Sequence, residues 1–453
     1  MVMVANRLPI RRTDHGWESS PGGLASALLP VAAAGDGAWV GWAGVPGLTL
    51  SRMSHPVGDR TVQLGSVPLS QNEIDLYYDG FANGTIWPLY HDAVRTPTFV
   101  REWWDAYEAV NRRFAEATAE IAAPGGTVWV HDYQLQLVPG MLRDLRPDLR
   151  IGFFLHIPFP PQELFMQIPW RAEIVRGLLG ADVIGFQVPV AARNFTTLAR
   201  RLVNAKGPMG ALRYGDRTVR VAAFPISIDV AACERVAADD STIRRSEEIR
   251  RELGNPSSIL LGVDRLDYTK GIDVRLRAFQ ELLRDGELTV PDCSLVQIAV
   301  PSRQDVEDYV GLRENVERLV GEINGEFGQM GTPAVHYLHR SLDFDELVAL
   351  YRAADVMLVT PLRDGMNLVA KEYVGSRLDD TGELVLSEFA GAARELRGAH
   401  LVNPHDIAAV KQAIVTAVRA RSKSDNRMRA MRKVVKRHDV HAWARSFLAA
   451  LDT

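Results

Sequence analysis

The sequence predicts an α/β protein with two tandem, doubly wound domains, each built on a parallel β-sheet. Short apolar runs rich in β-branched residues recur along the chain and indicate buried strands. Amphipathic helical patterns lie between many of these runs, and alternating strands and helices are typical of parallel sheets with helices on both faces. At 453 residues the chain is also too long for one ordinary core, so we expect two sizeable domains.

The first half of the chain contains five predicted strands. Residues 1–5 (MVMVA) and 38–42 (AWVGW) are apolar or small throughout, and 127–130, 151–156 and 183–186 combine β-branched and aromatic residues. Strands without an alternating polar face are typical of the buried centre of a parallel sheet. These runs therefore predict the core of a first domain.

The second half of the chain repeats the pattern with clearer helices between the strands. The predicted strands are 259–263, 294–300, 356–360 and 382–386. The segments with helical periodicity are 273–284, 304–327 and 343–354. This order predicts a second parallel sheet with its own helices.

The domain boundary is predicted after the segment FPISIDV at 224–230, where the pattern changes. An irregular, charge-rich passage at 237–253 follows before the next strand series begins. We therefore expect a first domain at 1–229 and a second at 230–437, with the amphipathic end of the chain, about 438–453, free to pack back on the first domain.

Composition excludes several classes of function. A formal net charge of −4 argues against a nucleic-acid surface. Cys233 and Cys293 are too few for a disulfide scaffold and have no metal-binding spacing. No apolar stretch approaches the roughly 20 residues of a membrane span, and the N-terminus enters a strand directly. We expect a cytoplasmic protein without a metal; the run HYLH (336–339) is interpreted as a strand and its edge.

A phosphate site is predicted where the strand at 259–263 ends. The loop after it presents Arg265 and Lys270 just before a helix opens near Gly271, so two cations lie beside free backbone amides. Arginine offers a planar fork and lysine a mobile charge, which suits a diphosphate. The alternative is that both cations form surface ion pairs with Asp264 and Asp267.

The loop PLRDGMNLVAKEY (361–373) places an acid on either side of a predicted helix start. Asp364 and Glu372 could accept hydrogen bonds from vicinal hydroxyls, and the amides of Asn367, Leu368 and Val369 could face a phosphate. The alternative is that Asp364 is only a helix cap and Glu372 a surface charge.

The first domain offers five further candidate residues at predicted loops and strand ends. Arg7 and Asp132 each end a predicted strand, Gly22 and Gly23 permit close approach of a ligand to the backbone, and His156 precedes a proline-rich loop. Each also has a structural explanation: a Gly-Gly pair is often a plain turn, and a lone histidine is more often structural than catalytic.

Ten segments taken together resemble glycosyltransferase family 20, the family of the trehalose-6-phosphate synthases. They are NRLP, SPGGL, YYDGFANGTIWPLYH, HDYQL, GFFLHIPFP, FPISID, VDRLDYTKGI, PSR, PLRDGMNLVAKEY and SEFAGAA. They run in order from about residue 4 to residue 404. The resemblance implies a GT-B fold, with two Rossmann-like domains facing across a cleft, an acceptor-binding domain at 1–229 and a nucleotide-sugar-binding domain at 230–437.

The resemblance implies the donor-binding residues. Arg265 and Lys270 match the clamp on the donor diphosphate, and Gly22 with Gly23 the loop that closes on the donor. Asp364 matches the acid that binds glucose hydroxyls. The other donor-binding matches are Glu372 for the ribose, the amides of Asn367, Leu368 and Val369 for the phosphates, and the backbone near Leu342 for the base.

The resemblance also implies the acceptor-binding residues. Arg7, Tyr78 and Arg303 match the pocket for the acceptor phosphate, Trp87 lies beside it, and Asp132 binds acceptor hydroxyls. His156 matches a residue next to the donor sugar, which places it with Arg265, Lys270 and Asp364 in the catalytic set.

The implied reaction moves glucose from a nucleoside-diphosphate glucose to glucose 6-phosphate, with retention at the anomeric carbon and by front-face attack without an enzyme nucleophile. It needs no cofactor. Because the chain ends without a phosphatase domain, trehalose itself would require a separate trehalose-6-phosphate phosphatase. Two rivals remain: a family member with another acceptor, and a nucleotide-sugar-binding regulatory subunit without turnover. The donor base (uridine, adenosine or guanosine) and the oligomeric state, a homo-oligomer included, stay open.

Overall fold

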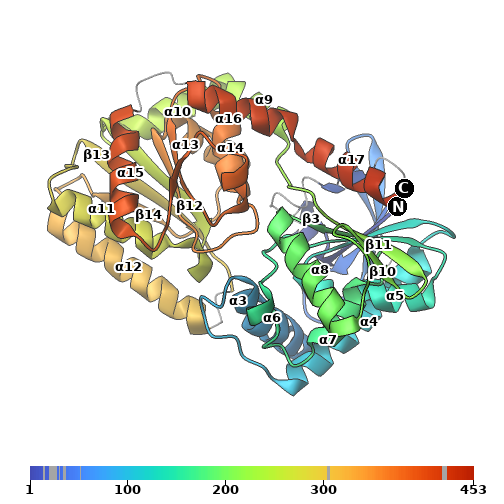
Figure 1. Ribbon diagram of the computed structural model, residues 1–453. Helices are drawn as coiled ribbons and strands as arrows, with labels where there is room; N and C mark the ends of the chain where they lie inside the picture. The colour runs from blue at the N-terminus through green and yellow to red at the C-terminus, as the bar shows by residue number, and fades with distance from the viewer. Residues whose placement is uncertain are drawn as a thin grey trace. The chain divides into compact units, whose positions relative to one another are not determined.

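A computed structural model describes residues 1–13, 16–19, 28–29, 31–33, 37–50, 53–303, 307–420 and 426–452. The chain forms two compact units, Met1–Ile226 with His441–Thr453 and Ser227–Val440. Each unit has its own sheet and its own core, so the expected α/β architecture with two parallel-sheet domains is confirmed (Figure 1). Among the described residues, no helix is both long enough and apolar enough to cross a membrane.

The first unit is built on a nine-stranded sheet in the order β10-β11-β9-β8-β7-β1-β4-β6-β5. Its strands are β1 (Val2–Arg7), β4 (Ala38–Trp42), β5 (Met53–Val57), β6 (Arg60–Ser66), β7 (Thr127–His131), β8 (Arg150–Phe154), β9 (Val183–Phe186), β10 (Ala211–Tyr214) and β11 (Arg217–Ala223). The strands from β11 to β6 pair in parallel, and only the edge strands β10 and β5 pair antiparallel. A separate hairpin joins β2 (Ile10–Thr13) to β3 (Gly16–Ser19).

The helical segments of the first unit include one long π-helix, η1, at Ile74–Ile86. The others are α2 (Gln71–Glu73), α3 (Trp87–Tyr90), α4 (Arg101–Ile121), the 3₁₀ turn η2 (Tyr133–Leu135), α5 (Val138–Leu145), α6 (Gln162–Phe165), α7 (Arg171–Leu178), α8 (Pro189–Val203) and α17 (Val440–Leu451). A π-helix is rare, and such segments are frequent at functional sites.

Helix α17 packs on the first unit through aromatic residues. The Phe447 ring stacks on Trp129 of β7, with ring centroids 4.4 Å apart, and Trp443 lies edge-on to Phe154 of β8 at 5.1 Å. Trp443 Nε1 also donates a hydrogen bond to the carbonyl of Phe224 at 3.1 Å. The amphipathic end of the chain therefore covers the face of β7 and β8.

The second unit has a six-stranded, fully parallel sheet in the order β14-β13-β12-β15-β16-β17. Its strands are β12 (Ser258–Arg265), β13 (Cys293–Val300), β14 (Val335–Leu338), β15 (Val356–Val359), β16 (Glu383–Ser387) and β17 (His400–Val402). Its helical segments are α9 (Val230–Ala238), α10 (Asp240–Glu252), η3 (Tyr268–Lys270), α11 (Ile272–Arg284), α12 (Glu307–Phe327), α13 (Phe344–Ala353), α14 (Leu368–Ser376), η4 (Gly391–Arg394), α15 (Ile407–Ala420) and α16 (Asn426–Arg437).

The strand order divides the helices of the second unit into two layers. Helices α11, α12 and α15 pack with one another, while α9, α10, α13, α14 and α16 form a second group (Figure 1). The chain moves outward from β12 to β14 and then returns past β12 to β15, so right-handed crossovers place the two groups on opposite faces. The order reverses between β12 and β15, and a ligand crevice is expected outside their carboxyl ends.

The charge-rich passage at 237–253 was predicted as irregular, and the structure corrects this prediction. It forms the end of α9 and all of α10, and Thr242, Ser246 and Ile249 lie on the buried face of α10. Helix α10 packs on α13, and Arg245 pairs with Glu346 across that contact at 2.9 Å. Because the apolar stripe holds few large residues, the charges of its exposed face dominated the sequence pattern.

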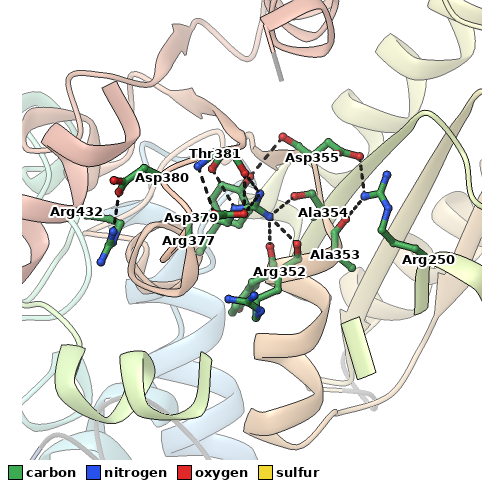
Figure 2. A network of polar contacts seen from close by, with 12 residues as sticks. Arg250, Arg352, Ala353, Ala354, Asp355, Arg377, Asp379, Asp380, Thr381 and Arg432 are labelled. Carbon is green, nitrogen blue, oxygen red and sulfur yellow. Dashed lines mark hydrogen bonds and ion pairs between the residues drawn. The ribbon is translucent and has the colours of Figure 1, made fainter. Parts of the chain in front are cut away.

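A buried arginine joins the ends of α13 and α14. Arg377 Nη1 donates to the carbonyls of Tyr351, Arg352 and Ala354 at distances of 2.7 to 3.1 Å (Figure 2). These carbonyls belong to the last turn of α13, which lacks intrahelical partners for them. Arg377 is also the C-cap of α14, so one side chain fixes both helices relative to the sheet.

Candidate active site

The predicted residues of the second unit gather at the carboxyl ends of β12 and β15. Arg265 is the last residue of β12 and is exposed, while Lys270 ends the 3₁₀ turn that follows and is buried. Lys270 Nζ lies 2.7 Å from Asp364 Oδ2 in the loop after β15. The structure therefore brings Lys270 and Asp364 together at the point where the strand order reverses.

A second buried ion pair, between Arg275 and Asp264, lies next to the turn that carries Lys270. Arg275 of α11 is fully buried and lies 2.7 Å from Asp264 Oδ2 in β12. It also donates to the carbonyl of Lys270 at 2.9 Å and to that of Leu358 at 3.1 Å. Burial raises the pKa of Asp264, although the nearby charges of Arg275 and Lys270 oppose that effect. Arg275 thus ties β12 and β15 to the turn that carries Lys270.

A third pair involves Arg303, just after β13. Arg303 Nη1 lies 3.1 Å from Asp267 Oδ2 and also contacts the Tyr309 hydroxyl. Thr269 N donates to the other carboxylate oxygen of Asp267 at 2.9 Å. Burial alone would raise the pKa of Asp267, but Arg303, Arg265 and Lys270 lower it well below its usual range. Asp267 is therefore a carboxylate at neutral pH, and Arg303 is held against it.

The ion pair observed for Lys270 differs from the alternative considered for the β12 loop. Lys270 pairs with Asp364, while Asp264 and Asp267 pair with Arg275 and Arg303. All three ion pairs are buried rather than on the surface.

Asn367, and not Asp364, is the N-cap of α14. It has a positive φ of 78°, and its Oδ1 accepts a hydrogen bond from Ala370 N at 3.1 Å. Asp364 Oδ2 instead accepts from Asn367 Nδ2 at 3.2 Å, next to Lys270. Leu368 and Val369 form the first turn of the helix, where backbone amides have no intrahelical acceptor. The capping explanation for Asp364 is therefore wrong.

Glu372 lies one turn further along α14 and is half-buried. The Tyr351 hydroxyl donates to Glu372 Oε2 at 2.9 Å. Burial raises the pKa of Glu372, and this hydrogen bond partly offsets the effect. Glu372 is thus an oriented acid on the helix and not a solvated surface charge.

Leu342, in the loop after β14, lines a cavity of about 210 Å³ in the second unit. His336 and Leu338 of β14, Arg340 and Arg245 also line it. Leu342 is half-buried at the carboxyl end of β14, beyond β13 and β12 in the sheet. This position is compatible with the predicted role of its backbone.

In the first unit, the side chains of Arg7 and Tyr78 both lie next to the ring of Trp42. The Arg7 guanidinium lies 4.1 Å from the centre of the Trp42 ring, and that ring is 6.4 Å from the ring of Tyr78 in η1. Arg7 and Trp42 are register partners in β1 and β4. A Cβ added to Gly44, which has a φ of +83°, would collide with the Arg7 guanidinium. Glycine at position 44, just after β4, therefore leaves room for the Arg7 guanidinium.

Asp132 and His156 lie at the carboxyl ends of β7 and β8. Asp132 adopts a positive φ of 74°, and its Oδ1 accepts a hydrogen bond from the backbone N of His156 at 3.1 Å. Trp87, the residue directly after η1, is buried, and its ring lies 5.5 Å from that of Tyr133, the residue after Asp132. The strand order of this unit reverses between β1 and β7, so Arg7 and Asp132 flank the expected ligand position.

Sequence reasoning missed three residues of these clusters: Trp42, His131 and Arg275. Trp42 ends a predicted strand and resembled a core residue, and His131 directly follows the predicted strand at 127–130. Asp267 was considered only as a partner of Arg265 or Lys270, and no local pattern indicates its contact with Arg303 or the place of Arg275 between the strands. Gly22 and Gly23, predicted to close on the donor, lie outside the described residues.

The structure also contains a larger cavity that none of the predicted residues lines. It measures about 740 Å³ in the first unit and includes Leu137, Gly180 and Arg217 among its walls. Gly180 and Arg217 lie at the amino ends of β9 and β11, opposite to the strand ends described above. Among the described residues, no three histidine, cysteine, aspartate or glutamate side chains gather as metal ligands.

Comparisons with known proteins cover the whole chain. The model of glycosyltransferase family 20 matches residues 1–453. The trehalose-6-phosphate synthase of Mycobacterium marinum is 58% identical over 99% of this chain and 93% of its own. A UDP-forming α,α-trehalose-phosphate synthase from Burkholderia xenovorans, solved with glucose 6-phosphate, matches at a TM-score of 0.90 with 34% identity, over 100% of this chain and 99% of its own.

A third relative was solved with a donor analogue. A structure described as trehalose-6-phosphate from Escherichia coli, bound with UDP-2-fluoro glucose, matches at a TM-score of 0.90 with 33% identity. The match covers 99% of this chain and 98% of that one. Both structural matches extend over the two units of the fold.

Proposed function

The chain belongs to glycosyltransferase family 20 and has its GT-B fold, and on that premise we propose that this glycosyltransferase makes α,α-trehalose 6-phosphate from a nucleoside-diphosphate glucose and glucose 6-phosphate. The observation that carries the proposal is the same in both units. The charged residues predicted for the two substrates stand at carboxyl strand ends, beside the point where the strand order reverses.

The second unit offers groups suited to the donor. Lys270 and Arg265 follow β12, and the first turn of α14 presents backbone amides, so cations and helix dipole both favour a diphosphate. Asp364 and Glu372 are oriented acids that suit the hydroxyls of glucose and ribose. Lys270 would exchange part of its contact with Asp364 for a phosphate oxygen.

The first unit offers groups suited to the acceptor. A phosphomonoester is close to a dianion at neutral pH, and the Arg7 guanidinium with the Tyr78 hydroxyl provides charge-assisted donors. Asp132 suits the acceptor hydroxyls, and Arg303 is proposed as a further cation for the acceptor phosphate. Trp42, which lies under Arg7, would keep that guanidinium in place.

The proposed reaction retains configuration by front-face attack. The C1 hydroxyl of glucose 6-phosphate forms a bond to the anomeric carbon of the donor while the bond from that carbon to the diphosphate breaks. The hydroxyl proton passes to an oxygen of the departing diphosphate. Lys270, Arg265 and the α14 amides stabilise the charge that develops there, a contribution of the kind that usually dominates such steps.

Two observations support UDP-glucose as the first donor to test. The Burkholderia relative is UDP-forming, and the E. coli relative binds a UDP sugar. ADP-glucose remains a proposed alternative, because the predicted contact to the base is made by the backbone near Leu342 and not by a side chain. The product carries a phosphomonoester that a separate phosphatase would have to remove.

A donor panel tests the proposal directly. The purified chain is assayed with UDP-, ADP- and GDP-glucose, each with glucose 6-phosphate, glycerol 3-phosphate or no acceptor, and both nucleoside diphosphate and disaccharide phosphate are measured. We expect turnover that depends on glucose 6-phosphate, with an α,α-linked product by proton NMR coupling. Faster turnover with glycerol 3-phosphate would reassign the acceptor, and donor binding without any release would indicate a regulatory subunit.

A further inference from the structure

Two histidines meet at the carboxyl ends of neighbouring strands in the first unit. His131 ends β7 and is fully buried, while His156 follows β8 and is half-buried. His131 Nδ1 lies 3.2 Å from His156 Nε2, and the ring planes are inclined by 28° with centroids 5.4 Å apart. Because two bare ring nitrogens would repel at this distance, one of them carries a proton.

The outer surroundings of the pair keep both rings neutral. Burial lowers the pKa of His156 to about 3, and burial together with the neighbouring His156 lowers the pKa of His131 well below its ordinary value. Aromatic rings adjoin both: Trp129 lies 4.8 Å from His131, and Phe154 and Trp443 lie 4.7 and 6.2 Å from His156. Each neutral ring therefore carries one proton. In the contact between His131 Nδ1 and His156 Nε2, either nitrogen can carry the proton and act as the donor.

The buried nitrogen of His131 decides between these arrangements. His131 Nε2 is buried and finds no hydrogen-bond partner among the described residues. If His156 donated from Nε2, His131 would have to carry its own proton on that buried Nε2. An orphaned buried N–H is rarer and more costly than a buried acceptor without a partner. The favoured arrangement has His131 donating from Nδ1–H to His156 Nε2.

We propose that His131 is a positioning residue that holds His156 as its Nδ1–H tautomer, so that His156 presents a hydrogen-bond donor at the carboxyl end of the sheet. No described residue bonds to His156 Nδ1, so this N–H can reach a ligand. The acceptor would be a hydroxyl oxygen of the donor sugar, and this last step rests on the proposed function. The assignment of the tautomer itself does not.

The backbone of His156 is fixed independently of His131. Its N–H donates to Asp132 Oδ1 at 3.1 Å, and its carbonyl accepts from Gln187 Nε2 at 3.4 Å. A change at residue 131 should therefore alter the ring of His156 more than its position. This separation makes the tautomer testable by substitution.

The test is nitrogen NMR of the histidine-labelled protein without substrate. The signals of His156 are identified by their loss in His156→Asn, and we expect a protonated Nδ1 with an unprotonated Nε2. His131→Leu should let the two tautomers mix, whereas His131→Asn, whose amide can donate from near the Nδ1 position, should restore the wild-type pattern. A wild-type His156 protonated at Nε2 overturns the proposal, even if His131→Leu does not fold.

Kinetics provide the second measurement. His131→Leu should lower kcat/KM for the donor about tenfold with no change in KM for glucose 6-phosphate, and His131→Asn should recover most of the loss. Added to His156→Asn, the leucine substitution should have no further effect. Full donor kinetics in folded His131→Leu would overturn the positioning role. If no donor supports turnover at all, the proposed function fails while the NMR result still decides the tautomer.

Discussion

At the scale of single residues, the cations of the second unit have a structural partner as well as a proposed ligand. Lys270 pairs with Asp364, and Arg303 pairs with Asp267. A substitution therefore removes an ion pair and a phosphate contact at once. Only a control that removes a comparable ion pair elsewhere can separate the two effects.

Lys270→Met should lower kcat about 100- to 1,000-fold, because one preorganised donor to a developing anion is lost. The matched control is Lys411→Met in α15, which removes a lysine paired with Glu281 and Asp285 on the surface of the same unit. We expect the control to keep wild-type kcat. If the kcat of Lys270→Met is within a few-fold of that of the control, Lys270 does not stabilise the leaving diphosphate.

Arg303→Met should weaken glucose 6-phosphate binding by about 2 kcal/mol, roughly 30-fold, with little change in donor KM. Its control is Tyr309→Phe, since the Tyr309 hydroxyl donates to the same oxygen of Asp267 at 3.1 Å without adding charge. Both variants should lower thermal stability, but only the first should raise the KM for glucose 6-phosphate. Equal KM changes for both substrates would place Arg303 outside the acceptor pocket.

The candidate site could be predicted from sequence where a residue stands next to its own strand end. Lys270, Asp364, Asp132 and His156 follow apolar runs, so their place at the sheet edge is a local property. Trp42 is different, because its contact with Arg7 requires β1 and β4 to pair. Partners that depend on strand pairing do not appear in a local pattern, so the sequence indicated Arg7 but not the Trp42 ring against which it lies.

At the scale of elements, the buried central strands were predictable, and the outer strands of the first sheet were not. Residues 38–42 and 183–186 were expected as strands and form β4 and β9 with the same bounds. These strands are apolar on both faces because helices cover both. The edge strands β5 and β10 and their neighbours β6 and β11 carry exposed polar residues and lack such a run, so they were missed, as was the amphipathic helix α10.

Arg377→Met should lower the free energy of unfolding of the second unit by about 3 kcal/mol, because three carbonyls at the end of α13 lose their shared donor (Figure 2). Methionine keeps much of the buried stem. The control Arg419→Met removes an exposed pair with Glu287 and should change stability by less than about 0.5 kcal/mol. Urea unfolding followed by circular dichroism measures both, and equal midpoints would show that other groups hold the two helices.

At the scale of the whole molecule, the two units can be observed separately. All nine tryptophans of the chain belong to the first unit, from Trp17 to Trp443, and the second unit has none. Tryptophan fluorescence therefore reports on the first unit, while circular dichroism reports on both. This asymmetry allows the acid response of the histidine pair to be assigned to its own unit.

The first unit should lose stability as the pH falls below about 6.5, the ordinary pKa of a histidine in the unfolded chain. In the folded protein the pKa values of His131 and His156 are lowered, so the unfolded state binds their protons first. Stability is fully present above the unfolded pKa and declines by about 1.4 kcal/mol per pH unit for each histidine. Asp267 has a lowered pKa as well, but its contribution is lost only below about pH 4.

Urea midpoints by tryptophan fluorescence at pH 7.5, 6.5 and 5.5 measure this loss. Between the last two values the wild-type protein should lose about 2 kcal/mol, roughly 1 kcal/mol for each histidine, because the full slope is reached only below the unfolded pKa. In the double variant His131→Asn, His156→Asn the same interval should show a much smaller loss, since asparagine does not titrate; His55 of the same unit also has a pKa lowered by burial and accounts for a residual slope. A full wild-type slope in this variant would mean that other groups of the first unit take up the protons.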